Sequence, residues 1–208
     1  MLKIWGRASS SNVMKVLWVC EELGIPYERV DAGGAFGRTR EPEYLAMNPN
    51  ARIPTIEEPD GFTLWESNSI CRYLVATRAP GHALHPAEPR ARALVERWMD
   101  WQLSHLGAPM TVVFFTYVRT PEDKRDMVAT AAARNEAEAL WDIVEGALAH
   151  GPYVAGAELT LADVVLAPMI HRWLNLPITR KDQPRLRAWY DRLMRHPGFA
   201  THIAVPMS

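Results

Sequence analysis

The sequence reads NPNARIP at residues 48–54 and ESNSI at residues 66–70. Cis peptide bonds occur almost only before proline. If the Ile53-Pro54 bond is cis, the chain turns sharply there and exposes the backbone N–H and C=O of Ile53. Ser67 is expected to lie at the start of a helix, whose first N–H groups and positive dipole end attract a carboxylate. A backbone edge beside such a helix start suits a small peptide ligand.

Each motif also has a purely structural explanation, since the proline could simply enter a strand and Ser67 could simply cap a helix. The residues before the motifs favour the functional interpretation. Between Asn12 and Leu23 the apolar residues recur at helical spacing, and Gly24 supplies a stop signal. Strands are expected on either side of this helix, and the short crossover favours a right-handed parallel pair.

The first part of the chain is therefore expected to form a compact unit of four strands and three helices. The expected strands are residues 2–5, 27–31, 55–57 and 62–64, and the expected helices are 12–23, 42–47 and 67–76. The glycine-rich bend at residues 33–37 is expected to be a loop, because it lacks the spacing of a phosphate-binding loop.

The rest of the chain is expected to be helical. Residues 1–78 would form the first domain, 79–87 a proline-rich linker and 88–208 an all-helical domain. Long helices are expected over residues 87–106, 120–149 and 184–195, with Thr120 as the N-cap of the second. In LTLADV, residues 159–164, Thr160 can cap the N–H of Asp163 while Asp163 reaches back, so Asp163 is assigned a folding role rather than a catalytic one.

Composition excludes several functions. The net charge of −1 gives no electrostatic case for nucleic acid or an anionic membrane, and no stretch approaches the roughly 20 apolar residues that span a bilayer. The first twelve residues contain charges and no long apolar run, so we expect no secretory signal and a cytoplasmic location.

The two cysteines, Cys20 and Cys71, cannot form a disulfide framework or a four-thiolate metal site, and both are expected to be buried, inert thiols.

Four motifs together carry a family resemblance. They are RASSSN at residues 7–12, NPNARIP at 48–54, ESNSICRYL at 66–74 and LTLAD at 159–163. From Leu2 to about Met194 the chain resembles the cytosolic glutathione transferase superfamily, in particular its bacterial-type branch with serine or asparagine in the active site. The resemblance implies an α/β thioredoxin-like N-terminal domain, an all-helical C-terminal domain, a homodimer, glutathione as co-substrate, no metal and a role in detoxification. The CxxC of a thioredoxin is missing, which excludes dithiol exchange by the chain's own cysteines.

The chemistry implied by the resemblance is thiol activation. A free thiol has a pKa near 8.5, and lowering it by about two units requires roughly 2.7 kcal/mol of preferential stabilisation of the thiolate. One hydroxyl hydrogen bond, with the dipole of the first helix, could supply this energy. Serine-type relatives have the catalytic hydroxyl at the position of Ser10, so Ser10 ranks first, Asn12 second and Ser11 third. The alternative is that these residues only cap the helix.

The remaining glutathione contacts also follow from the resemblance. The backbone of Ile53, held by Pro54, would pair with the cysteinyl part of the tripeptide. Glu66 and Ser67 would bind the γ-glutamyl amine and carboxylate, the first by charge and the second by its hydroxyl and the helix start. Arg52 could bind the glycyl carboxylate, and a solvated surface charge is an equal alternative.

The second substrate is expected between this site and the helical domain, in a mostly apolar pocket. Trp98 and His105 lie on one expected helix face and Phe114 follows, although such a stripe is often core. Residues 9–12, the serine turn, precede the first helix, and Arg7 beside this turn could face the same cleft and orient an anionic group.

The sequence thus predicts a glutathione transferase whose thiolate attacks a hydrophobic electrophile. A glutathione-dependent disulfide reductase using the same site is the first alternative. A non-catalytic glutathione-transferase-like binding protein is the second.

Overall fold

The N-terminal domain is built on a mixed four-stranded sheet in the order β2-β1-β3-β4. These assignments come from a computed structural model, which describes residues 1–207. β1 pairs in parallel with β2 and antiparallel with β3, which in turn pairs antiparallel with β4. The strands are β1 (Leu2–Trp5), β2 (Tyr27–Val30), β3 (Thr55–Glu57) and β4 (Thr63–Trp65). β4 begins one residue later than expected, because the Asp60 side chain accepts from the backbone N–H of Phe62 and extends the turn.

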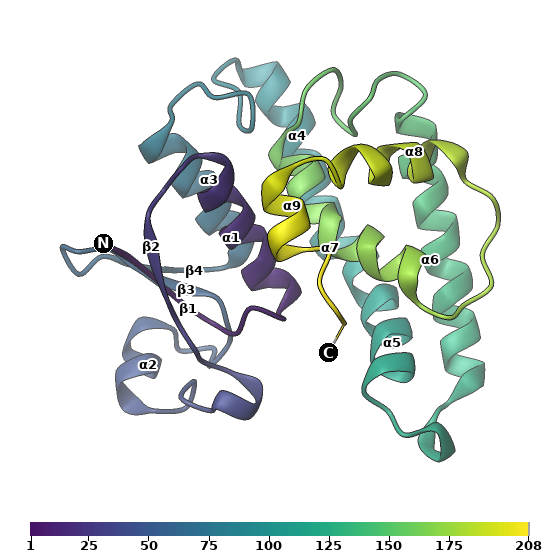
Figure 1. Ribbon diagram of the computed structural model, residues 1–208, viewed down its shortest axis with the longest axis horizontal. Helices are drawn as coiled ribbons and strands as arrows, with labels where there is room; N and C mark the ends of the chain where they lie inside the picture. Colours follow the sequence, from purple (N-terminus) through teal and green to yellow (C-terminus); the bar gives the residue numbers. More distant parts are fainter. Residues whose placement is uncertain (208) are drawn as a thin grey trace.

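Three helices complete this domain, namely α1 (Ser11–Glu22), α2 (Pro42–Met47) and α3 (Ser67–Arg78). Figure 1 shows α1 and α3 together on one side of the sheet and α2 on the other. α1 is buried almost all round, from Val13 to Cys20, because the sheet, α3 and the helical domain cover its different faces. The predicted thioredoxin-like unit of four strands and three helices is confirmed.

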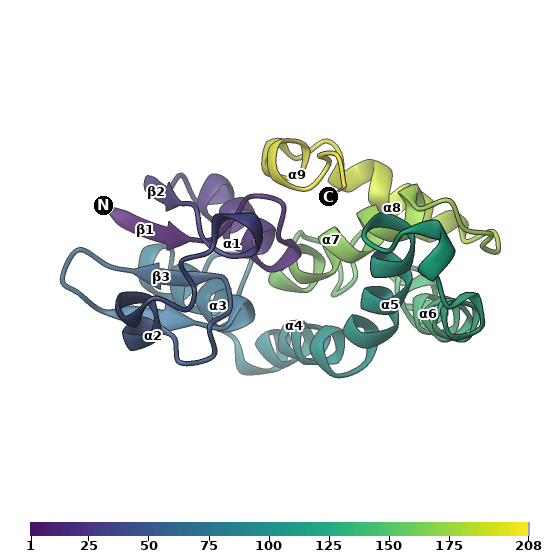
Figure 2. The same ribbon diagram turned by 90° about the horizontal axis from the view of Figure 1, so that it is seen from below.

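The C-terminal domain is all-helical, also as predicted. Its helices are α4 (Pro89–Trp101), α5 (Gly107–Val118), α6 (Met127–Ala147), α7 (Leu161–Asn175), α8 (Pro184–Leu193) and α9 (Pro197–His202). A π-helical turn, Gln102–Leu106, joins α4 to α5 without a break. α7 runs through the middle of the domain (Figures 1 and 2), and eleven of its side chains are buried.

Two predicted helices differ from the structure. α6 begins at Met127 rather than near Thr120, because Glu122–Lys124 forms a separate 3-10 turn and the Asp126 side chain caps the N–H of Ala129 at 2.9 Å. The final helix was also incomplete in the prediction: α8 ends at Leu193, and α9 follows with Pro197 at its first position.

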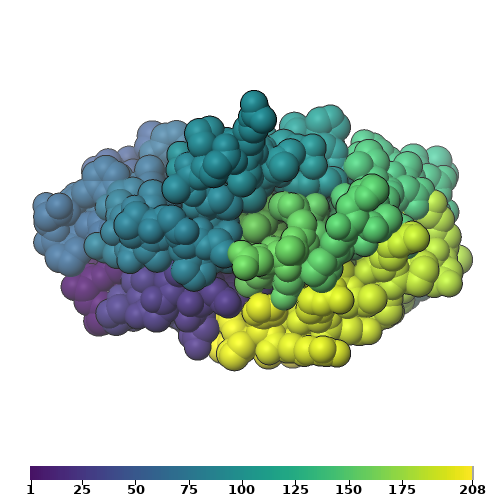
Figure 3. Space-filling view, turned by 90° about the horizontal axis from the view of Figure 1, so that it is seen from above, coloured from purple at the N-terminus to yellow at the C-terminus, as the bar shows by residue number. Residues whose placement is uncertain are grey.

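The capping box at the start of α7 is present as predicted. The Thr160 side chain accepts from the N–H of Ala162, while the Asp163 carboxylate accepts from the N–H of Thr160. The two domains meet along α1, which packs against α7 and α9. In Figure 3 the purple N-terminal segment and the yellow C-terminal segment accordingly lie side by side on one face of the molecule.

Candidate active site

Three segments meet at one edge of the sheet, and strand register explains why. Trp5 at the end of β1 pairs with Thr55 at the start of β3, and Thr55 also pairs with Trp65 at the end of β4. Because β3 is antiparallel to both neighbours, the residues after Trp5, before Thr55 and after Trp65 all leave the sheet at the same edge. The serine turn, the NPNARIP loop and the start of α3 are therefore neighbours.

The serine turn presents hydroxyl groups that the helix does not use. Ser10 is the N-cap residue of α1, with an extended backbone, but its side chain makes no capping hydrogen bond. Ser10, Ser11 and Asn12 are all half-buried. Within residues 1–207 none of these three side chains forms a hydrogen bond, so each remains available as a donor at the positive end of a twelve-residue helix.

The NPNARIP loop is held by a small hydrogen-bond network. The carbonyl of Arg52 accepts from the Tyr44 hydroxyl at 2.6 Å and from the Asn48 amide at 2.8 Å. Asn48 also donates to the Thr55 hydroxyl at 3.0 Å. The Ile53-Pro54 peptide bond is cis. The loop is therefore fixed in position by buried side chains on its inner side, while the Arg52 side chain is exposed.

Ile53 packs directly against Gly6, which lies between the end of β1 and the serine turn. A Cβ atom added to Gly6 would lie 3.4 Å from the Cβ of Ile53, and one added to Gly33 would lie 3.0 Å from its Cδ1. The glycines allow this close approach, which places the backbone of Ile53 next to the end of β1.

The start of α3 has an unusual backbone. Glu66 is the N-cap residue and adopts a φ of 72°, in the left-handed region that a non-glycine residue seldom occupies. Its side chain is exposed and makes no capping bond, whereas Ser67 is 4% exposed. Strained backbone of this kind is common at ligand-binding positions. The geometry leaves the Glu66 carboxylate open to the sheet edge where the serine turn and Ile53 also lie.

The chain's own thiols cannot supply a nucleophile here. Cys20 and Cys71 are both fully buried. Burial raises the pKa of each thiol to about 12, so both stay protonated at neutral pH. A thiolate at this site would have to come from a ligand.

The residues predicted for the second-substrate pocket are divided between two places. Arg7 leaves the end of β1 and lies against the 33–37 loop, where a Cβ added to Gly34 would be 2.9 Å from its Nε. Phe114 is buried under the guanidinium of Arg172, whose central carbon is 3.7 Å from the ring centre. Arg172 and Ser9 line one narrow crevice, so Phe114 lies close to the serine turn.

Trp98 and His105 lie elsewhere. Trp98 and Trp101 are in edge contact at 5.3 Å, and Trp101 stacks on His105 at 6.2 Å. Trp98 lines a hollow of about 330 Å³ between α4 and α6, together with Arg97, Trp101, Ile143 and Ala147. The structure therefore groups these rings on α4 and the π-helical turn that follows it, and not with the serine turn.

Sequence reasoning missed two cations near the site, Lys15 and Arg172. The Lys15 ammonium is completely buried and donates to Asn68 Oδ1 at 3.2 Å and to Gln102 Oε1 at 2.7 Å. Arg172 follows His171 directly after the buried apolar run of residues 164–170 in α7. For Lys15 the available signal was a single basic residue interrupting an apolar helical run, but the sequence does not show what such a residue faces.

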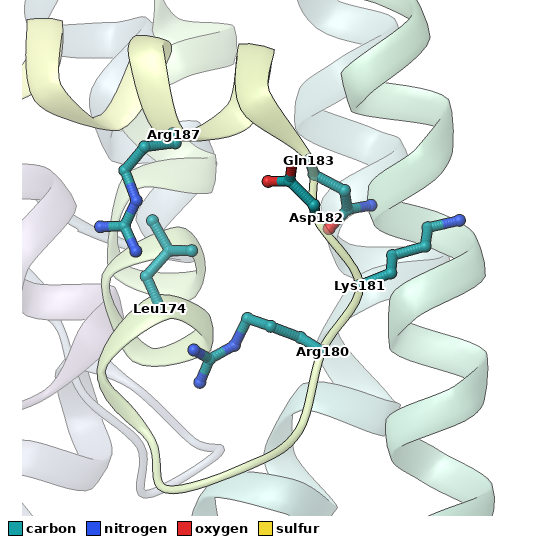
Figure 4. Close-up of a pocket in the computed structure, with 6 residues that line it drawn as sticks. All are labelled: Leu174, Arg180, Lys181, Asp182, Gln183 and Arg187. Atoms are coloured by element: carbon teal, nitrogen blue, oxygen red, sulfur yellow. The ribbon is translucent and has the colours of Figure 1, made fainter.

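A further hollow lies far from this site. It has a volume of about 320 Å³ and is formed by α7, the loop before α8 and α8 itself (Figure 4); its lining residues are Leu174, Arg180, Lys181, Asp182, Gln183 and Arg187. Figure 1 places that loop on the side of α7 away from α1. Its mostly charged lining and its position separate it from the sheet-edge site.

Comparison with known proteins agrees with the fold and the site. Residues 9–77 match the glutathione S-transferase N-terminal domain, and residues 127–192 match the glutathione S-transferase C-terminal domain. The chain therefore belongs to the glutathione S-transferase superfamily, as its motifs predicted, and it is a glutathione transferase.

Individual relatives cover the whole chain or nearly all of it. Glutathione S-transferase GstB of Escherichia coli K12 is 36% identical over 100% of both chains. A theta-class glutathione S-transferase from Xanthomonas axonopodis pv. citri, solved with glutathione bound, is 42% identical with a TM-score of 0.95, over 100% of this chain and 99% of its own. A glutathione S-transferase from Pseudomonas fluorescens is 30% identical with a TM-score of 0.84, over 99% and 98%.

Proposed function

We propose that this enzyme binds glutathione at the sheet edge, stabilises its thiolate with the Ser10 hydroxyl and directs the sulfur to an electrophilic carbon of a hydrophobic substrate. The observation that carries the proposal is the unused Ser10 side chain at the N-cap of α1. If Ser10 served only to cap the helix, its oxygen would accept from a backbone N–H, and it does not. Asn12 is the second candidate donor and Ser11 the third.

The three segments that meet at the sheet edge make the proposed contacts with glutathione. The backbone of Ile53, fixed by Pro54 and the Arg52 carbonyl network, pairs with the cysteinyl part. Glu66 binds the γ-glutamyl amine, and Ser67 with the first N–H groups of α3 binds the γ-glutamyl carboxylate. Support comes from the exposed Glu66 side chain and from the glutathione bound to the Xanthomonas relative. Arg52, exposed beside the loop, is assigned to the glycyl carboxylate.

The domain boundaries, the cellular location and the oligomeric state are also proposals. We assign residues 1–78 to the glutathione-binding domain, 79–87 to a linker and 88–208 to the domain that shapes the second-substrate site, in a cytoplasmic homodimer of the serine/asparagine branch. Large apolar side chains are exposed on the β3–β4 hairpin, on α4 and on the π-helical turn, and they support contact with a second copy; they include Phe62, Trp65, Leu94 and Leu103. Within residues 1–207 no helix combines the length and apolar character needed to cross a bilayer.

An ultraviolet difference titration with glutathione, from about pH 5 to pH 9, tests the thiolate assignment. We expect thiolate absorbance to appear near pH 6 to 7 in the wild type, well below the free thiol pKa of about 8.5. In Ser10→Ala the midpoint should rise by about 1 to 2 units, because one charge-assisted hydrogen bond of about 1.5 to 3 kcal/mol is lost.

Two further variants separate the candidates. If the midpoint stays low in Ser10→Ala but rises in Asn12→Ala or Ser11→Ala, the donor is reassigned to that residue and the transferase mechanism stands. Ser104→Ala, an exposed serine on the π-helical turn, is the matched control and should leave the titration unchanged. Glutathione bound without any thiolate at neutral pH would overturn the mechanism.

A further inference from the structure

Three arginines from distant parts of the chain gather beside the serine turn. The guanidinium carbon of Arg172 lies 3.7 Å from the Phe114 ring centre, and that of Arg119 lies 5.5 Å from the same centre and 5.0 Å from the Phe115 centre. Arg7 lies at the end of β1, two residues before Ser9, which lines a crevice together with Arg172. Arg7, Arg119 and Arg172 are called the arginine cluster below.

Two members of the cluster have no acidic partner. Among residues 1–207, no carboxylate forms an ion pair with Arg7 or Arg172. Nη1 of Arg7 is buried and makes no hydrogen bond. Buried guanidinium donors are normally paired, and an unpaired one in a structure calls for an explanation.

The charges of the cluster also act on one another. Burial, and then repulsion by Arg119, lower the pKa of Arg7. Burial, followed by repulsion from Arg119 and Arg7, lowers the pKa of Arg172 to about 10. With a pKa of about 10, the Arg172 guanidinium remains charged at neutral pH. Like charges held together and partly desolvated create a strongly positive local potential, which attracts an anion.

The position of the cluster suggests which anion. A guanidinium binds a carboxylate through two parallel hydrogen bonds, and this geometry favours arginine over lysine at such sites. Phe115, whose side chain is 45% exposed, offers an apolar surface next to Arg119. A molecule with its carboxylate on the cluster and its apolar body along Phe115 would lie beside the serine turn, where the proposed sulfur is held.

We propose that the arginine cluster binds a carboxylate of the second substrate, so that the enzyme prefers electrophiles carrying an acidic group apart from the reacting carbon. This inference rests on the proposed function, since the sulfur nucleophile comes from glutathione. With a benzylic bromide, the thiol proton passes to solvent, the sulfur–carbon bond forms and the carbon–bromine bond breaks, releasing bromide. The substrate's carboxylate is unchanged.

The test compares 4-(bromomethyl)benzoate with 4-(bromomethyl)benzamide, which has the same shape without the charge. Rates with glutathione are measured with the wild-type enzyme and corrected for the reaction without enzyme. We expect kcat/KM for the benzoate to exceed that for the benzamide by about tenfold or more, the effect of one charge-assisted pair. A ratio at or below one would overturn the inference while leaving the proposed transferase in place. If neither compound is turned over, the proposed transferase function itself is contradicted.

Variants assign the effect to the cluster. Arg172→Gln and Arg7→Gln should each lower the benzoate-to-benzamide ratio by about tenfold, and Arg172→Lys should restore part of it. Arg195→Gln, an exposed arginine between α8 and α9, should leave both rates unchanged. Unchanged ratios in both cluster variants would overturn the assignment.

A measurement without variants covers the case in which a substituted chain fails to fold. With the wild type, 4-methylbenzoate should inhibit benzamide turnover competitively, and 4-methylbenzamide should inhibit at least about tenfold less well. Equal inhibition by the two compounds would contradict a carboxylate site.

Discussion

The Asp163 carboxylate is completely buried and accepts four hydrogen bonds. Its Oδ1 accepts from the N–H of Val154 at 2.9 Å and the indole of Trp189 at 3.0 Å, while its Oδ2 accepts from the N–H and the hydroxyl of Thr160 at 2.9 and 3.1 Å. Burial raises the pKa of Asp163 to about 6, against the opposing effect of these donors. One side chain thereby joins the start of α7 to the preceding loop and to α8, which is the structural role its capping motif predicted.

Replacing Asp163 by asparagine should lower the free energy of unfolding by about 2 to 4 kcal/mol. An amide has the same shape, but its NH₂ group would face N–H donors that now bond to a carboxylate oxygen. Urea unfolding near pH 7 measures the change. Asp182→Asn, an exposed acid before α8, is the control and should stay within about 0.5 kcal/mol of wild type. A similarly small effect at Asp163 would contradict the four-bond role.

At the scale of elements, α9 is held against α1 by a close approach of glycine to an indole. A Cβ atom added to Gly198 would lie 2.2 Å from Cδ1 of Trp18, closer than any van der Waals contact permits. Phe199 packs edge-on against the same indole at 5.5 Å. Both Trp18 and Phe199 are completely buried, so the indole has little room to move away.

We therefore expect Gly198→Ala to destabilise the protein by about 1 to 3 kcal/mol through overpacking. The matched control is Gly146→Ala, because Gly146 lies inside α6 and an added Cβ would meet nothing within 4 Å. That substitution should stabilise the protein by about 0.5 to 1 kcal/mol, the helix advantage of alanine. Thermal melts of the two variants should shift in opposite directions. Equal shifts would show that α9 can move off Trp18 at no cost.

The elements that were predictable are those with local signals. Periodic apolar residues identified α1, the capping box identified the start of α7, and two short strands joined by a turn identified the β3–β4 hairpin. The start of α6 was misplaced because Thr120-Pro121 has the chemistry of a helix start, yet it initiates only a 3-10 turn. α9 was missed because a helix of six residues contains too few apolar positions to show a period.

The backbone segments of the candidate site could be predicted from the sequence, but the side chains around them could not. The three segments at the sheet edge could be named from motifs, because each motif specifies its own backbone. The positions of the side chains around these segments could not be predicted, since Trp98 and Phe114 give the same signal in the sequence although only Phe114 lies under Arg172. Which neighbour a side chain meets depends on how helices distant in sequence pack, and no local pattern encodes that.

At the scale of the whole molecule, Lys15 joins the two domains through a buried polar network. From α1 its ammonium reaches Asn68 on α3 and Gln102 in the helical domain, and Asn68 donates to the Met99 carbonyl at 2.9 Å. Both acceptors of the ammonium are neutral amides, so no carboxylate bonds directly to the charge. The domains are thus connected by hydrogen bonds that a mismatched side chain would leave unsatisfied.

Stability should depend on pH through Lys15. Burial lowers the pKa of Lys15 from the ordinary 10.5 to about 8; Cys71 and Glu66 act in the opposite direction, and Arg172 adds to the decrease. Between about pH 8 and 10.5 the folded protein therefore binds fewer protons at this site than the unfolded chain, so stability rises with pH across that window. Below about pH 8 the cost of burying the charge is present in full.

Replacing Lys15 by methionine removes this titration while keeping a long side chain. The free energy of unfolding of wild type minus that of Lys15→Met should increase by about 3 kcal/mol between roughly pH 8 and pH 10.5, as 1.36 kcal/mol per pKa unit requires. Urea unfolding of both proteins at several pH values gives the difference, in which other titrating groups cancel. Lys124→Met, at an exposed lysine, should show no such slope. A flat difference for Lys15 would mean that its ammonium reaches water and that the domain contact opens locally.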